Sequence, residues 1–155
     1  MYAADRAEHV QSVIMPALER GAIVVTDRYV DSSLAYQGAG RQLPQSEIAS
    51  LNRWATGGLQ PDLTIVLDLP PAVGLGRRLS SADRLESEPV EFHERVRSAF
   101  LSLAAGDPGR YLVLDAARPE GEVSRDIQLR VRELLPDPVP RAAEENTGSF
   151  PAIRE

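Results

Sequence analysis

The sequence predicts an α/β fold, in which a parallel sheet is flanked by helices. Three short runs rich in β-branched and other apolar residues have the length of buried strands. Segments with apolar residues at helical spacing lie between these runs and after them. Because strands that alternate with helices pair in parallel through crossover connections, we expect a single sheet. Its strands are expected at Ala22–Thr26, Leu63–Leu69 and Tyr111–Asp115.

Five segments have the apolar spacing of a helix. In the first, Asp5–Arg20, we expect Pro16 to kink or interrupt the helix because proline lacks a backbone N–H donor. Gly21 follows at the position where a left-handed glycine commonly ends a helix. A pair of glycines and a proline end the second, Ser46–Thr56. The other helices are expected at Pro71–Leu79, Val90–Ala105 and Glu120–Leu135.

The length and composition indicate one folded domain with a tail. A chain of 155 residues is long enough to bury about 70% of its unfolded surface. From Pro136 onward, prolines and scattered charges replace the apolar pattern. Such a composition cannot offset the entropy of ordering, so residues 137–155 are expected to form a disordered tail. The folded domain is expected to span residues 1–136.

The charge and the absence of cysteine limit the possible partners and compartments. A net charge of −6 argues against nucleic acid as a partner, because the phosphate backbone attracts basic proteins. No apolar run approaches the ~20 residues that a membrane helix needs, so no membrane partner is expected. No secretory signal is expected either, and with no cysteines the sequence favours the cytoplasm.

Polar side chains follow the first predicted strand. Asp27 and Arg28 come directly after it, and Ser33, Tyr36 and Gln37 follow within ten residues. Ligands of open α/β sheets bind beyond the carboxyl ends of the strands, so this cluster is a candidate site. A solvated strand end with an internal Asp27–Arg28 pair is the alternative reading. Arg28 is suited to bind phosphate, and Asp27 either orders a magnesium shell or orients Arg28.

Several motifs follow one another in a distinctive order. They are Tyr2-Ala3-Ala4-Asp5-Arg6, Asp27-Arg28-Tyr29, Ser32-Ser33-x-x-Tyr36-Gln37-Gly38, Pro61-Asp62-Leu63-Thr64 and Asp83-Arg84-x-Glu86. In order and spacing the chain resembles bacterial thymidylate kinase from Met1 to about Pro136. The resemblance implies a P-loop NTPase-like parallel sheet, incomplete at the N-terminus, and the reaction of ATP with dTMP to give ADP and dTDP. ATP and Mg²⁺ are the cofactors that it implies.

The resemblance also implies how the base and the sugar of dTMP are bound. Tyr2 would stack on thymine, and Arg6, four residues later on the same helix face, would hydrogen-bond the base. Ser33 and Gln37 would contact the base, and Tyr36 would crowd the 2′ position of the sugar. Two alternatives stay open, because Tyr2 could be frayed and idle and Tyr36 could be ordinary core packing.

The phosphates are assigned by the same resemblance. Arg28 would hold the phosphate of dTMP, and Asp27 would lie by the magnesium ion and the reacting phosphates. Arg77, Arg78 and Arg84 flank a loop without apolar periodicity, which suits a lid over phosphates. In the family such lid arginines supply charge to the transition state. A solvated helix end is the alternative for Arg77 and Arg78.

The chain departs from the family in its phosphate loop. All 17 basic residues are arginine, so no GxxxxGK[ST] loop is encoded. We expect about 60 further residues upstream, as two βα units, and little kinase activity from this chain alone. The alternatives are a non-catalytic module that binds nucleotide or a partner, and another deoxynucleotide or deoxynucleoside kinase. Family members commonly dimerise, so a homodimer through Asp5–Arg20 or Ser46–Thr56 is possible.

Overall fold

The computed structural model describes residues 2–76 and 88–135, except for the side chains of Tyr2 and Leu75. The predicted tail, residues 137–155, therefore lies outside the described residues. None of the described helices combines the length and the apolarity that crossing a membrane requires.

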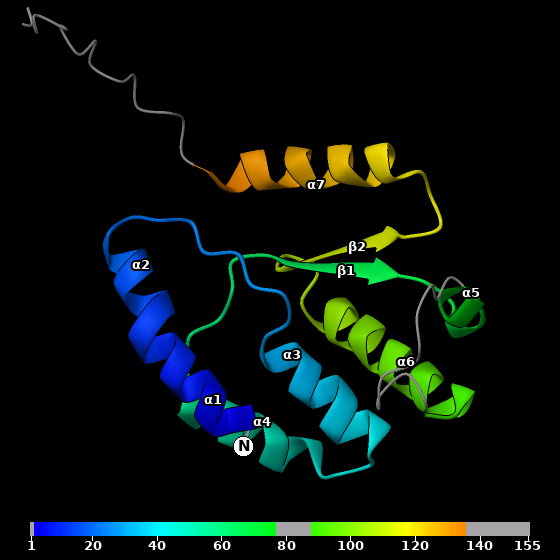
Figure 1. Ribbon diagram of the computed structural model, residues 1–155, viewed down its shortest axis with the longest axis horizontal. Coiled ribbons are helices and arrows are strands. Elements are labelled where there is room, and N and C mark those ends of the chain that lie inside the picture. The colour runs from blue at the N-terminus through cyan, green and yellow to red at the C-terminus, as the bar shows by residue number, and fades with distance from the viewer. Residues whose placement is uncertain (1, 77–87, 136–155) are drawn as a thin grey trace, which may run out of the picture.

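Two parallel strands form the sheet of the described residues. β1 (Thr64–Asp68) pairs with β2 (Tyr111–Asp115) in a register that places Thr64 opposite Tyr111. The connection between them runs through α5 (Pro71–Gly76) and α6 (Val90–Gly106), and α7 (Glu120–Leu134) follows β2. α6 lies on one side of the strand pair and α7 on the other (Figure 1). The α/β class and the last two predicted strands are confirmed.

The prediction of a strand at Ala22–Thr26 is wrong. This segment is irregular, and Val25 is 90% exposed and Ile23 67% exposed. A strand needs a neighbour for its N–H and C=O groups, and no described residue pairs with the backbone of residues 23–26. β-branched composition alone therefore leaves the segment extended and exposed.

The first predicted helix is interrupted, as expected. α1 (Tyr2–His9) passes into a π-helical turn, η1 (Val10–Ile14), and then into α2 (Met15–Glu19). Pro16 lies in the first turn of α2, where a missing N–H costs nothing. Gly21 adopts φ +72° and ends the helix, as predicted.

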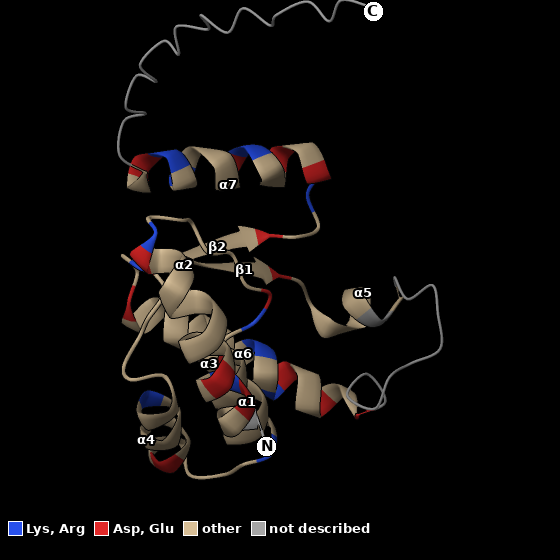
Figure 2. Cartoon of the chain, turned by 60° about the vertical axis from the view of Figure 1, so that its left-hand side comes forward, with Lys and Arg blue, Asp and Glu red and all other residues tan. Residues whose placement is uncertain are grey.

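The helix α4 (Gln45–Ala55) also matches its prediction within one residue, as do α6 and α7. The helix predicted at Pro71–Leu79 is confirmed as α5 up to Gly76, and its last residues lie outside the described part. Acidic and basic residues are interspersed along α7 (Figure 2). These helices are the ones with the clearest apolar period in the sequence.

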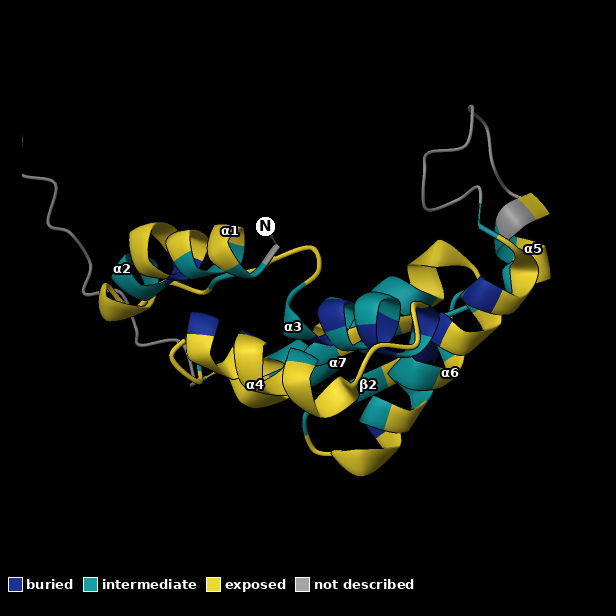
Figure 3. Cartoon of the chain, turned by 90° about the horizontal axis from the view of Figure 1, so that it is seen from below, coloured by how far each residue is buried: buried dark blue, intermediate teal, exposed yellow. Residues whose placement is uncertain are grey.

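One helix was not predicted. Residues 30–40 form α3 (Val30–Ser32) and a second π-helical stretch, η2 (Ser33–Gly40). Serine and glycine are weak helix formers, so packing rather than propensity stabilises this helix. Ala35 is fully buried against Phe92 and Val96 of α6, and buried residues gather where the two helices meet (Figure 3). A Cβ on Gly40 would lie 2.7 Å from the Phe92 ring, so the contact requires glycine.

Candidate functional site

Arg6 of α1 is enclosed by three hydrogen-bond acceptors from three other segments. Its guanidinium donates to the Ser33 Oγ at 3.1 Å, to the Tyr29 carbonyl at 3.1 Å and to the Asn52 Oδ1. The Tyr29 ring centre lies 5.7 Å from the guanidinium carbon. The structure thus brings together Arg6 and Ser33, which the sequence assigned to one ligand.

The acceptors around Arg6 are all neutral. Burial lowers the pKa of Arg6, whereas the charges of Tyr29, Asp5 and Asp31 act in the opposite direction. Within residues 2–76 and 88–135, no carboxylate forms an ion pair with it. A half-buried cation without a counter-ion favours a ligand that offers oxygen atoms.

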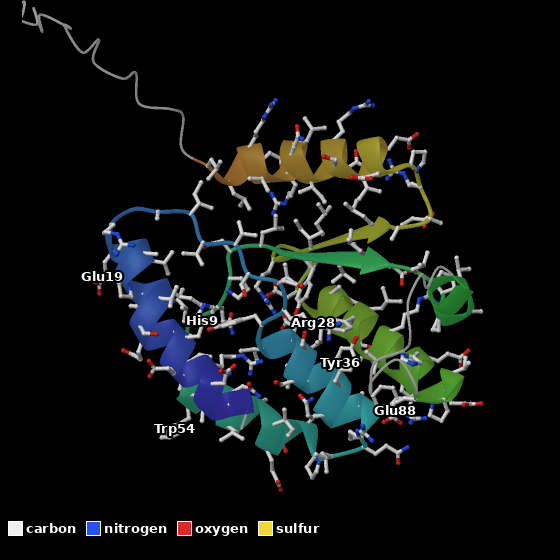
Figure 4. The ribbon with its side chains drawn as sticks, in the orientation of Figure 1. His9, Glu19, Arg28, Tyr36, Trp54 and Glu88 are labelled. Carbon is white, nitrogen blue, oxygen red and sulfur yellow. The ribbon has the colours of Figure 1, made fainter. Side chains whose placement is uncertain are left out.

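Arg28 adopts an unusual backbone conformation beside Tyr36. Its φ of +69° lies in the left-handed region, which non-glycine residues rarely adopt and which is often found at functional sites. The Thr26 hydroxyl donates to the Arg28 carbonyl at 3.1 Å and supports this turn. The guanidinium lies 5.0 Å from the Tyr36 ring centre, and Figure 4 shows the two side chains beside α3 and α6. Arg28 is exposed and available to an anion.

Tyr36 both packs on the core and borders the site. Its ring lies 6.2 Å from the ring of Phe92 and 6.2 Å from that of Phe100, tilted on the first and edge-on to the second. Arg28 lies against the same ring. The two sequence readings of Tyr36, core packing and ligand contact, are therefore compatible, because α6 fixes the ring while part of the residue stays accessible.

The remaining predicted residues are not joined to these pairs. Asp27 is exposed, and the side chains of Asp27 and Gln37 form no hydrogen bond or ion pair with another described residue. The alternative of an internal Asp27–Arg28 pair is therefore wrong. In the described part of the chain, no three or more acidic or histidine side chains cluster to hold a metal ion. The Tyr2 side chain and the predicted lid arginines Arg77, Arg78 and Arg84 lie outside the described residues.

A buried network fixes the helix of residues 30–40 to the start of both strands. The Asp31 carboxylate accepts hydrogen bonds from Arg110 and from the Thr64 hydroxyl, both at 3.3 Å. Arg110 also donates to the Tyr111 hydroxyl at 2.7 Å. Burial acts to lower the pKa of Arg110, but its hydrogen bond with Asp31 and the Asp31 charge outweigh it, and the pKa is raised. These contacts fix the position of the helix of residues 30–40 relative to the two strands.

The carboxyl end of β1 carries a second ion pair. Arg97 of α6 donates two hydrogen bonds to the Asp68 carboxylate, at 2.6 and 2.8 Å. The hydrogen bond from Arg97 holds the pKa of Asp68 below its usual range. Asp68 is therefore ionised and already paired with Arg97. Asp27, the neighbour of Arg28 in the sequence, has no such partner among the described residues.

Sequence reasoning missed Asn52 and gave Tyr29 no role. Asn52 is only 2% exposed, yet an asparagine within a helical apolar pattern looks like a tolerated polar residue. The available signal was its position, four residues after Ile48 and three before Ala55, which places it on the inward face of the predicted helix. Arginines with unsatisfied N–H donors beside aromatic rings are typical of proteins that bind planar, anionic ligands, the class to which nucleotides belong.

The comparisons with known proteins agree with this class. The thymidylate kinase family matches residues 1–127, and the chain belongs to this family of kinases. The thymidylate kinase of Clavibacter michiganensis subsp. michiganensis is 56% identical over 138 residues, which cover 87% of this chain and 65% of that protein. That of Bifidobacterium longum subsp. infantis is 50% identical, covering 90% of this chain and 60% of the relative. The family implies a P-loop NTPase fold, with which the parallel strands and flanking helices agree.

A relative from Deinococcus radiodurans, also a thymidylate kinase, is 53% identical over 135 residues, which cover 86% of this chain and 66% of that protein. The chain thus spans a little less than two thirds of the length of the curated relatives it matches.

Proposed function

We propose that this chain provides the dTMP site of a kinase that phosphorylates dTMP to dTDP with ATP. The observation that carries the proposal is that two arginines contact the helix of residues 30–40. Arg6 contacts Ser33, and Arg28 lies against Tyr36, one turn further along the same helix. Family membership supports the same assignment.

The proposed contacts divide dTMP into three parts. Arg6, Ser33, Gln37 and Tyr2 contact the thymine base, in which carbonyl oxygens accept hydrogen bonds from the guanidinium. Arg28 binds the 5′-phosphate, because its exposed planar fork suits two phosphate oxygens.

Tyr36 closes the space beside C2′ of the sugar, where the aromatic cluster of α6 keeps its ring in place. A ribose hydroxyl would meet this ring, so deoxyribose is preferred.

Asp27 fits a role beside magnesium. Mg²⁺ in phosphoryl-transfer sites keeps several waters and uses one or two carboxylates besides the substrate phosphates. Asp27 is exposed, has no ion-pair partner among the described residues and lies next to Arg28, the proposed phosphate ligand, so it meets this requirement. When bound, Mg²⁺ with ATP neutralises charge on the transferred phosphoryl group. Asp27 would orient the water shell of the ion, while Arg28 holds the acceptor phosphate in place.

The lysine of the family's phosphate loop is not among these 155 residues, which contain none. We therefore expect the chain alone to bind dTMP and to transfer phosphate far more slowly than about 1 per second, the lower range of kinases. Arg77, Arg78 and Arg84 remain candidates for charge stabilisation in the complete reaction.

Calorimetric titration of the 155-residue chain with a panel of nucleotides tests the proposal. We expect dTMP to bind at least about tenfold more tightly than dCMP or the ribonucleotide of thymine, since one lost or added polar contact costs about that factor. A coupled assay with ATP and dTMP measures transfer in parallel. Equal affinity for all nucleotides would contradict a dTMP site, and preference for another deoxynucleotide would favour a related kinase. If the native protein from the source cells also binds dTMP but transfers no phosphate, that result would favour a non-catalytic module.

We also propose a homodimer through α4. Leu51 and Trp54, one turn apart on this helix, are 49% and 81% exposed. Large exposed apolar side chains at helical spacing are typical of protein contacts. Sedimentation equilibrium should give twice the chain mass of 16.9 kDa, and Trp54→Glu should give the single mass. A wild-type protein that is monomeric at about 50 micromolar, well above a micromolar dissociation constant, contradicts the dimer.

A further inference from the structure

We infer that Asn52 is a positioning residue for Arg6 and thereby contributes to recognition of the pyrimidine base. The inference rests on the proposed function, in which Arg6 meets the base of dTMP. Asn52 itself comes from α4, outside the segments to which the sequence assigned the site. It would act through Arg6 and without touching the ligand.

The orientation of the Asn52 side chain is fixed by its own helix. Its Nδ2 donates to the Ile48 carbonyl one turn earlier, at 2.7 Å. An amide has one donor side and one acceptor side, so this bond turns the Oδ1 toward the Arg6 guanidinium. Asn52 is 2% exposed, and water cannot readily replace either contact. The side chain therefore presents a single acceptor in a set direction.

Asn52 is the acceptor of Arg6 that a ligand does not disturb. Ser33 is expected to contact the base, and its hydroxyl is then shared between the base and Arg6. The Tyr29 carbonyl belongs to the turn that follows the strained Arg28, which is expected to bind phosphate. Asn52 lies on a regular helix away from both changes. It keeps Arg6 in the same rotamer before and after binding.

Because the amide of Asn52 is neutral, it leaves the positive charge of Arg6 uncompensated. A carboxylate at this position would form an ion pair and compete with the ligand for the guanidinium. Asn52 orients the cation by one hydrogen bond. With the bonds to Ser33 and Tyr29, three of the five guanidinium N–H donors are used, which leaves two for a carbonyl oxygen. The chemistry recognised is an oxygen of a pyrimidine ring, which explains why a half-buried arginine has no acidic partner among the described residues.

Three ligands separate this role from a purely structural one. Thymidine carries the base, deoxyribose 5-phosphate carries the phosphate, and dTMP carries both. We expect Asn52→Leu, which keeps the size and removes the acceptor, to weaken dTMP and thymidine about tenfold and to leave deoxyribose 5-phosphate unchanged. Circular dichroism checks folding, and Asn52→Ala carries the same expectation if leucine prevents folding. Glu47→Ala, on the exposed side of α4, is the matched control and should bind like the wild type.

A double-mutant cycle tests whether Asn52 acts through Arg6. In an Arg6→Met background, Asn52→Leu should cause no further loss of thymidine affinity, because the group it positions is gone. A second tenfold loss in that background, or an equal loss for deoxyribose 5-phosphate, would overturn the inference.

The control experiment on Arg6 separates the two proposals. Suppose that the wild type binds dTMP, that Arg6→Met weakens this binding and that Asn52→Leu does not. The inference about Asn52 then fails, and the proposed function stands. If wild type shows no preference for dTMP, both fail.

Discussion

Replacing Arg110 with methionine is expected to lower the free energy of unfolding by about 3 kcal/mol. Arg110 is the main cation facing Asp31, and the two side chains are 18% and 10% exposed. Removing one member of a buried ion pair leaves an uncompensated charge, which typically costs about 3–5 kcal/mol. We take the lower end because Thr64 still donates to Asp31. For a domain of this size the melting temperature should fall by about 6–12 °C.

Urea unfolding followed by circular dichroism measures this loss. Arg118→Met is the matched control, because Arg118 forms ion pairs with Glu122 and Asp126 at the surface and should lose much less stability. A double variant with Asp31→Leu and Arg110→Met should recover part of the loss, since it removes both buried charges. Equal losses for Arg110→Met and Arg118→Met would contradict the importance of the buried network.

Arg28→Met is expected to weaken dTMP binding by a factor of about 10 to 100. Hydrogen bonds to a charged group are worth about 1.5–3 kcal/mol, and Arg28 is the proposed partner of the phosphate. Methionine keeps an unbranched side chain at the same strained backbone position, so the turn itself is little changed. Calorimetric titration with dTMP and with thymidine separates phosphate from base contacts. Thymidine should change by less than about threefold.

Arg28→Lys is the second variant of this test. Lysine keeps the charge but cannot lie flat on Tyr36 or present two parallel donors, so we expect a loss between those of the wild type and of methionine. Equal weakening of dTMP and thymidine by Arg28→Met would show that Arg28 supports the fold of the site and does not bind phosphate.

The elements that sequence could predict are those whose apolar residues repeat with the right period. Tyr111–Asp115 is a strand with the predicted bounds, and α6 differs by one residue. Ala22–Thr26 is richer in β-branched residues than Tyr111–Asp115, but a strand also needs a hydrogen-bonding neighbour, which composition does not encode. The helix of residues 30–40 shows the opposite case, in which weak local propensity is overcome by packing on α6.

The candidate site was predictable in part for the same reason. The resemblance assigned Arg6 and Ser33 to one base, and the two side chains do lie within hydrogen-bond distance, whereas their contacts with the base stay predictions. It gave no sign of Asn52, because a single buried asparagine has no distinctive spacing. Contacts made between distant segments depend on how helices are rotated, and one sequence does not specify that rotation.

The π-helical turn η1 (Val10–Ile14) determines such a rotation. Its hydrogen bonds run from each residue to the fifth one along, so it takes up one residue more than an α-helical turn. One extra residue rotates everything before it by roughly 100° about the axis. The turn thereby shifts the direction of Arg6 relative to α2, where Pro16 lies, while the buried residues Val10 and Ile14 belong to the turn itself. The residues of α1 near the candidate site and the residues of α2 can therefore face different directions, although the two segments belong to one continuous helix.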